Sequence, residues 1–182
     1  MLNQELEDKI QRYISEFLKI PEFRKGFKQT HHYHTTVSDH SIHVAEISAK
    51  IGYTLNKMGM HLSLDTLIRG SLLHDIGIVD ARKKTKKEMG HCLAIYHPLR
   101  SVELAQKYIN DLSKREKNLI EAHMFPLSLH IPKYKESWVV RLADSIAPIK
   151  ELRGYHASFK GRKCENRTRH IDSKKKYAIL KR

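Results

Sequence analysis

The chain has 182 residues, of which 40% are hydrophobic, and a formal net charge of +14 at pH 7. This length allows one well-packed core but is too short for two ordinary domains. No apolar run approaches the roughly 20 residues that cross a bilayer. Residues 1–10 also lack the apolar core of a signal peptide, so the sequence predicts a cytoplasmic protein with no membrane partner.

Two features of the composition restrict the kind of site and partner. Cys92 and Cys164 are the two cysteines, so the sequence indicates neither a disulfide framework nor a thiolate zinc site. Residues 150–182 hold 12 Lys and Arg against 3 Asp and Glu, which predicts a basic tail at 154–182 behind a domain at 1–153. Such charge attracts phosphate-bearing partners, either a small phosphorylated substrate or a nucleic acid, unless it is only a solvated surface.

The first predicted helix spans residues 4–20, with an apolar stripe at helical spacing that includes Ile10 and Ile14. Pro21 is expected to stop this helix, because proline cannot continue the backbone hydrogen-bond ladder. The polar, His-rich stretch at 29–36 predicts a loop.

The second predicted helix begins near Ser38 or Asp39, which are both good N-cap residues, and ends before Gly59. His40 and Val44 share one face at a step of four residues. Because that face carries the other apolar residues of the helix, His40 is expected to point into the core.

A third helix is predicted at 64–78, with Ser63 as its N-cap. His74 lies on its apolar stripe, and Asp75 points slightly round from that stripe. A further helix is expected at 98–110, with its proline in the first turn.

Ser113 and Glu116 have the spacing of a capping box, which predicts a helix that reaches His123. The last core helix is predicted at about 136–152, where Asp144 interrupts a wide apolar surface. Alternation of the strand type never persists in the chain. The predicted fold class is therefore all-α.

Six side chains able to bind a metal fall on or beside these predicted helices. They are His40, His74, Asp75, His97, His123 and Asp144. A buried carboxylate such as that of Asp144 is rare unless it is paired or binds a metal. Imidazole and carboxylate together suit a hard or borderline divalent ion, and helical bundles build such sites from facing helices. The alternatives are ordinary core histidines and, for Asp144, a helix N-cap or an ion pair with Arg141 on an exposed face.

Three segments in this order resemble the HD-domain superfamily of metal-dependent phosphohydrolases. Residues 72–77, Leu-Leu-His-Asp-Ile-Gly, match the HDIG motif of that superfamily. Residues 40–46 resemble its first motif, and residues 140–144 resemble the last, in which an aspartate closes the metal site. The resemblance covers about residues 30–150 and implies a single all-α bundle with the metal site in its core.

Two further segments, 97–101 and 121–123, lie where binuclear HD enzymes supply two more histidines. Such enzymes include the HD-type diadenosine tetraphosphate hydrolases and the HD-GYP cyclic-dinucleotide phosphodiesterases. The chain departs from the HD-GYP pattern, because Ile78 stands in place of the lysine after the motif and no Gly-Tyr-Pro signature follows.

This similarity implies a site for two divalent ions, with Asp75 and His74 at the catalytic centre and Asp75 as the bridge. His40, His74 and Asp144 would complete one ion, and His97 and His123 would complete the other. Ligation by nitrogen and oxygen without thiolate suits Fe or Mn, and also Zn, Co or Ni.

The resemblance implies hydrolysis of a phosphoester or phosphoanhydride bond, in a nucleotide or a related small phosphorylated substrate, by metal-activated water. Candidate substrate-binding residues are His34, Thr35, Lys83, Lys84 and His91; a solvated loop is the alternative reading. His91 also competes with His97 as a ligand. Two other functions stay open: a nucleic-acid- or partner-binding module on an HD scaffold, and a di-iron oxygenase with the same ligands. The sequence assigns no general acid and no oligomeric state.

Overall fold

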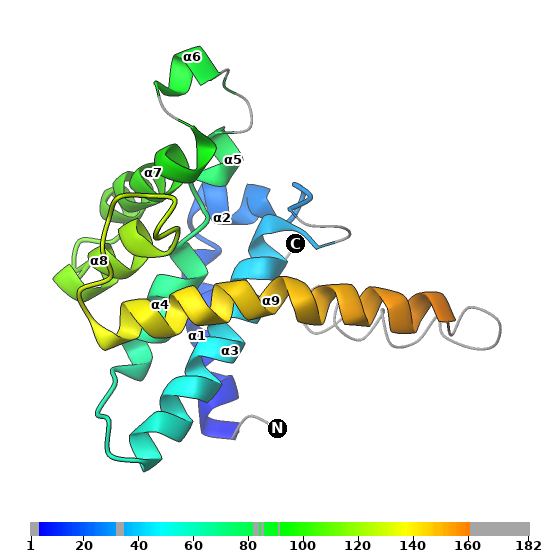
Figure 1. Ribbon diagram of the computed structural model, residues 1–182, viewed down its shortest axis with the longest axis vertical. Coiled ribbons are helices and arrows are strands. Elements are labelled where there is room, and N and C mark those ends of the chain that lie inside the picture. Colours follow the sequence, from blue (N-terminus) through cyan, green and yellow to red (C-terminus); the bar gives the residue numbers. More distant parts are fainter. Residues whose placement is uncertain (1–3, 32–34, 82–83, 85, 91, 161–182) are drawn as a thin grey trace.

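The computed structural model describes residues 4–31, 35–81, 84, 86–90 and 92–160, and every regular element within them is a helix (Figure 1). The helices are α1 (Gln4–Phe17), α2 (Pro21–Gly26), α3 (Val37–Lys57), α4 (Leu64–Leu73), α5 (Ile78–Ala81), α6 (Lys86–Met89), α7 (Leu93–Tyr108), α8 (Lys114–Ala122) and α9 (Lys135–Lys160). The all-α prediction is confirmed.

The centre of the bundle is α4, in which seven of the ten residues are buried. Most of its surface is covered by other parts of the chain, as is typical of a helix at the centre of a bundle. It packs against α3, α8 and α9, and α3 also lies along α9. Between α3 and α4, the buried hydroxyls of Ser48 and Ser71 lie 3.1 Å apart. The C-terminal end of α4 is therefore enclosed by helices that are distant in sequence.

Two predictions near the N-terminus were wrong in detail. The first helix ends at Phe17, and Pro21 does not simply stop it but begins α2, because proline is tolerated at a first helical position. The N-cap of α3 is Thr36 and not Ser38 or Asp39. Its hydroxyl oxygen accepts the backbone N–H of Asp39 at 3.2 Å.

The predicted caps of two later helices are confirmed, but one predicted helix end is wrong. Ser63 caps α4, and Ser113 forms the complete capping box of α8 with Glu116. However, α4 ends at Leu73, and residues 74–77 form turns instead of continuing the helix to 78. His74 and Asp75 are thus presented by a helix end and the turn that follows it.

Two helices are longer than the sequence predicts. The helix expected at 98–110 begins at Leu93, which places His97 on a helix, with Pro98 inside it; an interior proline removes one backbone hydrogen bond without ending the helix here. The last helix runs to Lys160 instead of about 152, and its end extends beyond the other helices (Figure 1). The predicted basic tail lies outside the described residues from 161 onward. Among the described helices, none is both long and apolar enough to cross a membrane.

Asp65, in the first turn of α4, connects this helix to α1. Its carboxylate accepts a hydrogen bond from the Tyr13 hydroxyl at 2.7 Å and lies 3.1 Å from the Lys9 ammonium. Burial alone would raise the pKa of Asp65, but the hydrogen bonds from Tyr13 and Lys9 outweigh it and lower the pKa below its usual value. Burial and the bond to Asp65 raise the pKa of Tyr13 to about 12.

We expect Asp65→Asn to lower the free energy of unfolding by about 1 kcal/mol at neutral pH, because it removes a charged acceptor shared by two donors. The pKa of Asp65 is lower in the folded chain than in the unfolded one. The difference between the proteins is therefore complete above about pH 4 and shrinks as the pH falls through the folded pKa. Urea unfolding of both proteins, at neutral pH and below pH 4, measures this difference in the free energy of unfolding. Asp8→Asn, an exposed change on α1, is the control, and an equal loss there would contradict the role of Asp65.

Candidate metal centre

Two histidines of the predicted set end helices in the same way. His74 follows α4 and His123 follows α8, and in each the ring Nδ1 lies 2.7 Å from a backbone carbonyl oxygen three residues earlier. The last carbonyls of a helix lack partners within the helix, so the ring N–H can donate to one of them. This bond places the proton on Nδ1 and leaves the lone pair of Nε2 directed into the protein.

His97, on α7, lies next to His123. Its Nδ1 lies 2.7 Å from the carbonyl oxygen of Leu93, and its Nε2 lies 2.9 Å from Nε2 of His123. With both ring protons on Nδ1, the two Nε2 lone pairs repel each other unless a cation lies beside them. Two nitrogens about 2.1 Å from one ion and at right angles to each other are about 3.0 Å apart, so this pair fits a metal.

The Nε2 atom of His74 also fits a metal. It is buried and has no hydrogen-bond partner among the described residues. Carboxylate oxygens of Asp75 and Asp144 lie 3.4 and 3.6 Å from it. Because buried polar atoms are rarely left without a partner, a cation held between this nitrogen and the two carboxylates would explain the arrangement.

The two oxygens of Asp75 face different histidines. Oδ1 lies 3.4 Å from Nε2 of His97 and 3.5 Å from Nε2 of His123. Oδ2 lies 3.4 Å from Nε2 of His74 and 3.4 Å from Nε2 of His31. Burial would raise the pKa of Asp75, but the neighbouring histidines outweigh burial and hold it well below the usual range. The residue is therefore an anion between two groups of imidazoles.

Asp144 closes one side of this cluster from α9. Its Oδ1 lies 2.9 Å from Nε2 of His40, a fully buried side chain of α3. Burial would lower the pKa of His40, but the hydrogen bonds to Asp144 and Glu151 raise it to about 10. A divalent cation would take the place of the proton that these carboxylates hold on the ring.

The structure thus brings all six predicted donors together around the end of α4. In the described part of the chain, three groups of donor atoms lie within 4.8 Å of one another and could hold a metal. These groups are His31, His40 and Asp75; His40, His74 and Asp144; and His74, Asp75 and His123. The carboxylate of Asp75 connects the second and third groups to His97.

His31 also approaches the candidate centre, and it is not among the site residues predicted from the sequence. It belongs to the loop before α3, where its backbone N–H donates to the carbonyl of Thr35 at 2.7 Å. Its ring lies 4.6 Å from that of His40, between centroids, and its Nε2 approaches Asp75. The available signal was the cluster of histidines in this loop, but the sequence does not say which of them points inward.

Glu151 was also not selected, and it lies directly behind His40. Its Oε1 lies 3.1 Å from Nδ1 of His40 and 2.9 Å from Nδ1 of His43. Burial would raise the pKa of Glu151, but the bonds to His40 and His43 lower it to about 2. The signal in the sequence was its place seven residues after Asp144, which is two helical turns and so the same face of α9.

The predicted substrate-binding residues have a less direct relation to this cluster. Thr35 lies in the loop of His31. The exposed ammonium of Lys84 donates to the hydroxyl of Tyr96 at 2.8 Å. His34, Lys83 and His91 lie outside the described residues. Their role in binding a substrate stays a prediction.

The family model described as HD domain matches residues 37–149. No curated protein and no solved structure matches the chain. All six predicted donors lie inside the matched segment, whereas His31 and Glu151 lie outside it.

Proposed function

Because the chain belongs to the HD domain family, whose members bind divalent metals, we propose that it is a metal-dependent phosphohydrolase. The observation that carries this proposal is the position of Asp75, whose two oxygens face two different groups of histidines at 3.4 to 3.5 Å. A carboxylate placed in this way suits a bridge between two metal ions. Two-metal sites are common in enzymes that hydrolyse phosphoesters.

In this proposal, each oxygen of Asp75 would help to hold one ion. His40, His74 and Asp144 would hold the first ion with Oδ2, and His97 and His123 would hold the second with Oδ1. When bound, such ions lower the pKa of a water molecule and neutralise charge on the phosphoryl oxygens. The nitrogen and oxygen donors suit Fe or Mn, and also Zn, Co or Ni.

The chain's own residues prepare the site in three ways. Backbone carbonyls fix the Nδ1 proton of His74, His97 and His123, so their Nε2 atoms are available as donors. The side chain of Asp75 is only 4% exposed, so its charge acts in a region where little water screens it. The neighbouring imidazoles keep that carboxyl group ionised.

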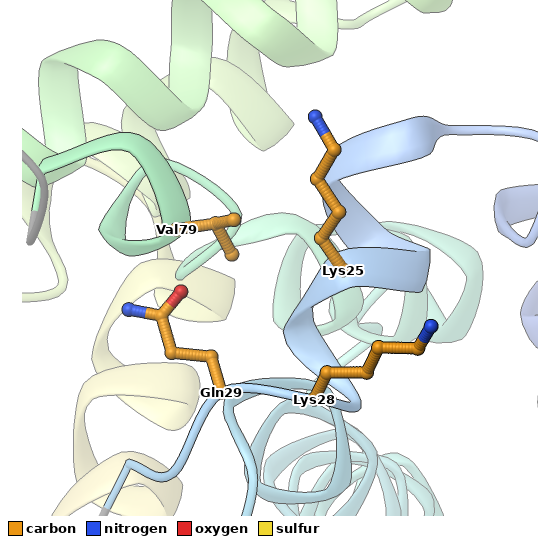
Figure 2. A pocket seen from close by; sticks show the side chains of 4 residues that line it. All are labelled: Lys25, Lys28, Gln29 and Val79. Atoms are coloured by element: carbon orange, nitrogen blue, oxygen red, sulfur yellow. The ribbon is translucent and has the colours of Figure 1, made fainter.

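The proposed substrate is a small phosphorylated molecule, of which a nucleotide or a dinucleoside polyphosphate is the form that the resemblance favours. The net charge of +14 supports this choice, because a positive protein attracts phosphate groups. A cavity of about 240 Å³ is lined by Lys25, Lys28, Gln29 and Val79, but both lysine ammonium groups point away from Gln29 and Val79, so this cavity adds no support for a phosphate site (Figure 2).

Elemental analysis of anaerobically purified protein, combined with a panel of nucleotides and simple phosphoesters, tests the proposal. Bound metal and metal-dependent release of phosphate or nucleotide are expected. Protein that binds no metal after reconstitution with Fe or Mn would contradict the proposal. Iron-dependent O₂ consumption without hydrolysis would instead indicate an oxygenase. Metal-independent, salt-sensitive binding of oligonucleotides would indicate a nucleic-acid-binding module.

We expect His97→Ala to reduce the metal content from about two ions per chain to about one, because this histidine would serve only the second ion. Elemental analysis of the reconstituted protein measures this. His130→Ala, at a histidine outside the proposed site, is the control. Full metal content in the His97 variant would exclude His97 as a ligand.

A further inference from the structure

The carboxylate of Glu151, on α9, contacts two histidines of α3 behind the candidate metal centre. Its Oε1 lies 3.1 Å from Nδ1 of His40 and 2.9 Å from Nδ1 of His43. The side chain of Glu151 is 3% exposed and that of His40 is fully buried, whereas that of His43 is 45% exposed. The carboxylate therefore lies between a buried imidazole of the candidate metal centre and a second imidazole that reaches the surface.

The contact bears on how His40 can serve a cation. Its other ring nitrogen, Nε2, faces Oδ1 of Asp144 at 2.9 Å. An imidazole gives a lone pair to a metal only from the nitrogen that carries no proton, so the position of the ring proton decides whether Nε2 can bind. An ionised carboxylate only accepts hydrogen bonds. Glu151 therefore favours the form of His40 that has its proton on Nδ1.

The placement of Glu151 follows from the packing of two helices. Asp144 and Glu151 are two turns apart on one face of α9, and α9 packs along α3. One face of α9 therefore presents a carboxylate to each ring nitrogen of His40. His43 lies three residues after His40 on α3, so it flanks the same carboxylate.

We propose that Glu151 is a positioning residue of the metal centre, which holds the proton of His40 on Nδ1 and directs Nε2 toward the ion, and that His43 fixes Glu151 in this position. The inference rests on the proposed function, because it requires a metal at His40. Glu151 lies beyond residues 37–149, the segment that matches the HD domain. In this proposal the centre extends beyond the segment that matches the family, further along α9.

Binding of Co²⁺ tests this inference without any measurement of activity. Metal-free full-length protein is titrated with Co²⁺ under anaerobic conditions, and its visible absorption is followed. We expect Glu151→Gln to weaken Co²⁺ binding by about 10- to 100-fold, the usual effect of losing a carboxylate behind a ligand histidine. The glutamine has nearly the same shape but no charge, so the helix packing is retained.

A matched control separates this role from a purely structural one. Glu136 is also on α9 and is 2% exposed, but it accepts hydrogen bonds from the backbone N–H of Ser63 and from Arg115. Glu136→Gln is expected to lower the melting temperature of the metal-free protein and to leave Co²⁺ affinity unchanged. If both variants lose stability and neither loses affinity, Glu151 is structural and the inference is wrong.

His43→Ala provides a second measurement that does not alter a proposed ligand. It removes one of the two hydrogen-bond contacts described for Glu151, and we expect Co²⁺ affinity to fall by a few-fold. Unchanged affinity in this variant would contradict the role of His43. If the Glu151 variant does not fold, the Co²⁺ affinity of the His43 variant decides whether the pair of Glu151 and His43 positions His40. If the unaltered protein binds no Co²⁺, the proposed function fails. If it binds Co²⁺ and Glu151→Gln binds equally well, only this inference fails.

Discussion

Asp75→Asn is expected to reduce phosphoester hydrolysis by at least about 1,000-fold and to leave no more than about one metal ion per chain. The carboxylate of Asp75 supplies the negative charge between the two groups of imidazoles, with four Nε2 atoms at 3.4 to 3.5 Å. An asparagine of the same shape removes this charge. It also turns an N–H₂ donor toward nitrogens or cations on one side, so it cannot act as a bridge.

Hydrolysis of the best substrate from the phosphoester panel and elemental analysis measure this effect. Asp80→Asn is the matched control, because Asp80 is on α5, five residues after Asp75, and accepts a hydrogen bond from Arg100 at 3.1 Å. We expect this control to keep its metal and its activity. An Asp75 variant that retains two ions and full turnover would show that the carboxylate is not a bridge.

Gly77→Ala is expected to lower the free energy of unfolding by about 2–3 kcal/mol, at the upper end of the usual cost of overpacking. A Cβ atom at this position would lie 2.5 Å from the carbonyl oxygen of His97 and 2.7 Å from the backbone nitrogen of Ser101. Both are backbone atoms of α7, so the helix itself would have to move. The Gly77 N–H also donates to the Ser101 hydroxyl oxygen at 2.9 Å, and this bond would be strained.

Gly70→Ala is the control for this prediction, because Gly70 is also buried and near the same site. The atoms that its Cβ would meet belong to the Leu119 side chain, the nearest at 2.7 Å, and a side chain can rotate away. Alanine is also favoured over glycine inside a helix by about 1 kcal/mol, so the net loss at position 70 should be clearly smaller. Urea unfolding of both variants measures the difference. Equal losses would show that α7 does not limit the space at Gly77.

The sequence was sufficient to place the six donors on or beside helices but not to show how the helices present them. The periodic pattern of 64–78 predicts one continuous helix, whereas α4 ends at Leu73. The ring of His74 bonds to a carbonyl at this end, and the chain then turns at Gly77 against α7. Such an end depends on a contact with a distant helix, and local propensity carries no information about it.

His31 and Glu151 could not be identified for a related reason. Both lie outside residues 37–149, the segment that matches the HD domain. Both contact residues that are distant in the chain, because His31 approaches Asp75 and Glu151 bonds to His40. Glu151 is separated from His40 by 111 positions, and a glutamate on a helix is normally a solvated residue. The helical register relative to Asp144 was visible in the sequence. Tertiary packing decides which face of α9 is directed toward α3, and the sequence does not show this.

The number of residues between α3 and α9 in the sequence also determines when each part of the candidate centre is synthesised. His40 and Glu151 are 111 residues apart, and a ribosome adds about 5–20 residues per second, so roughly 6–22 s pass between their synthesis. During this interval the histidines of α3, and His74 after α4, exist without the carboxylates of α9. The complete candidate centre can form only after α9 has been synthesised, so its assembly is a late step in the maturation of the chain.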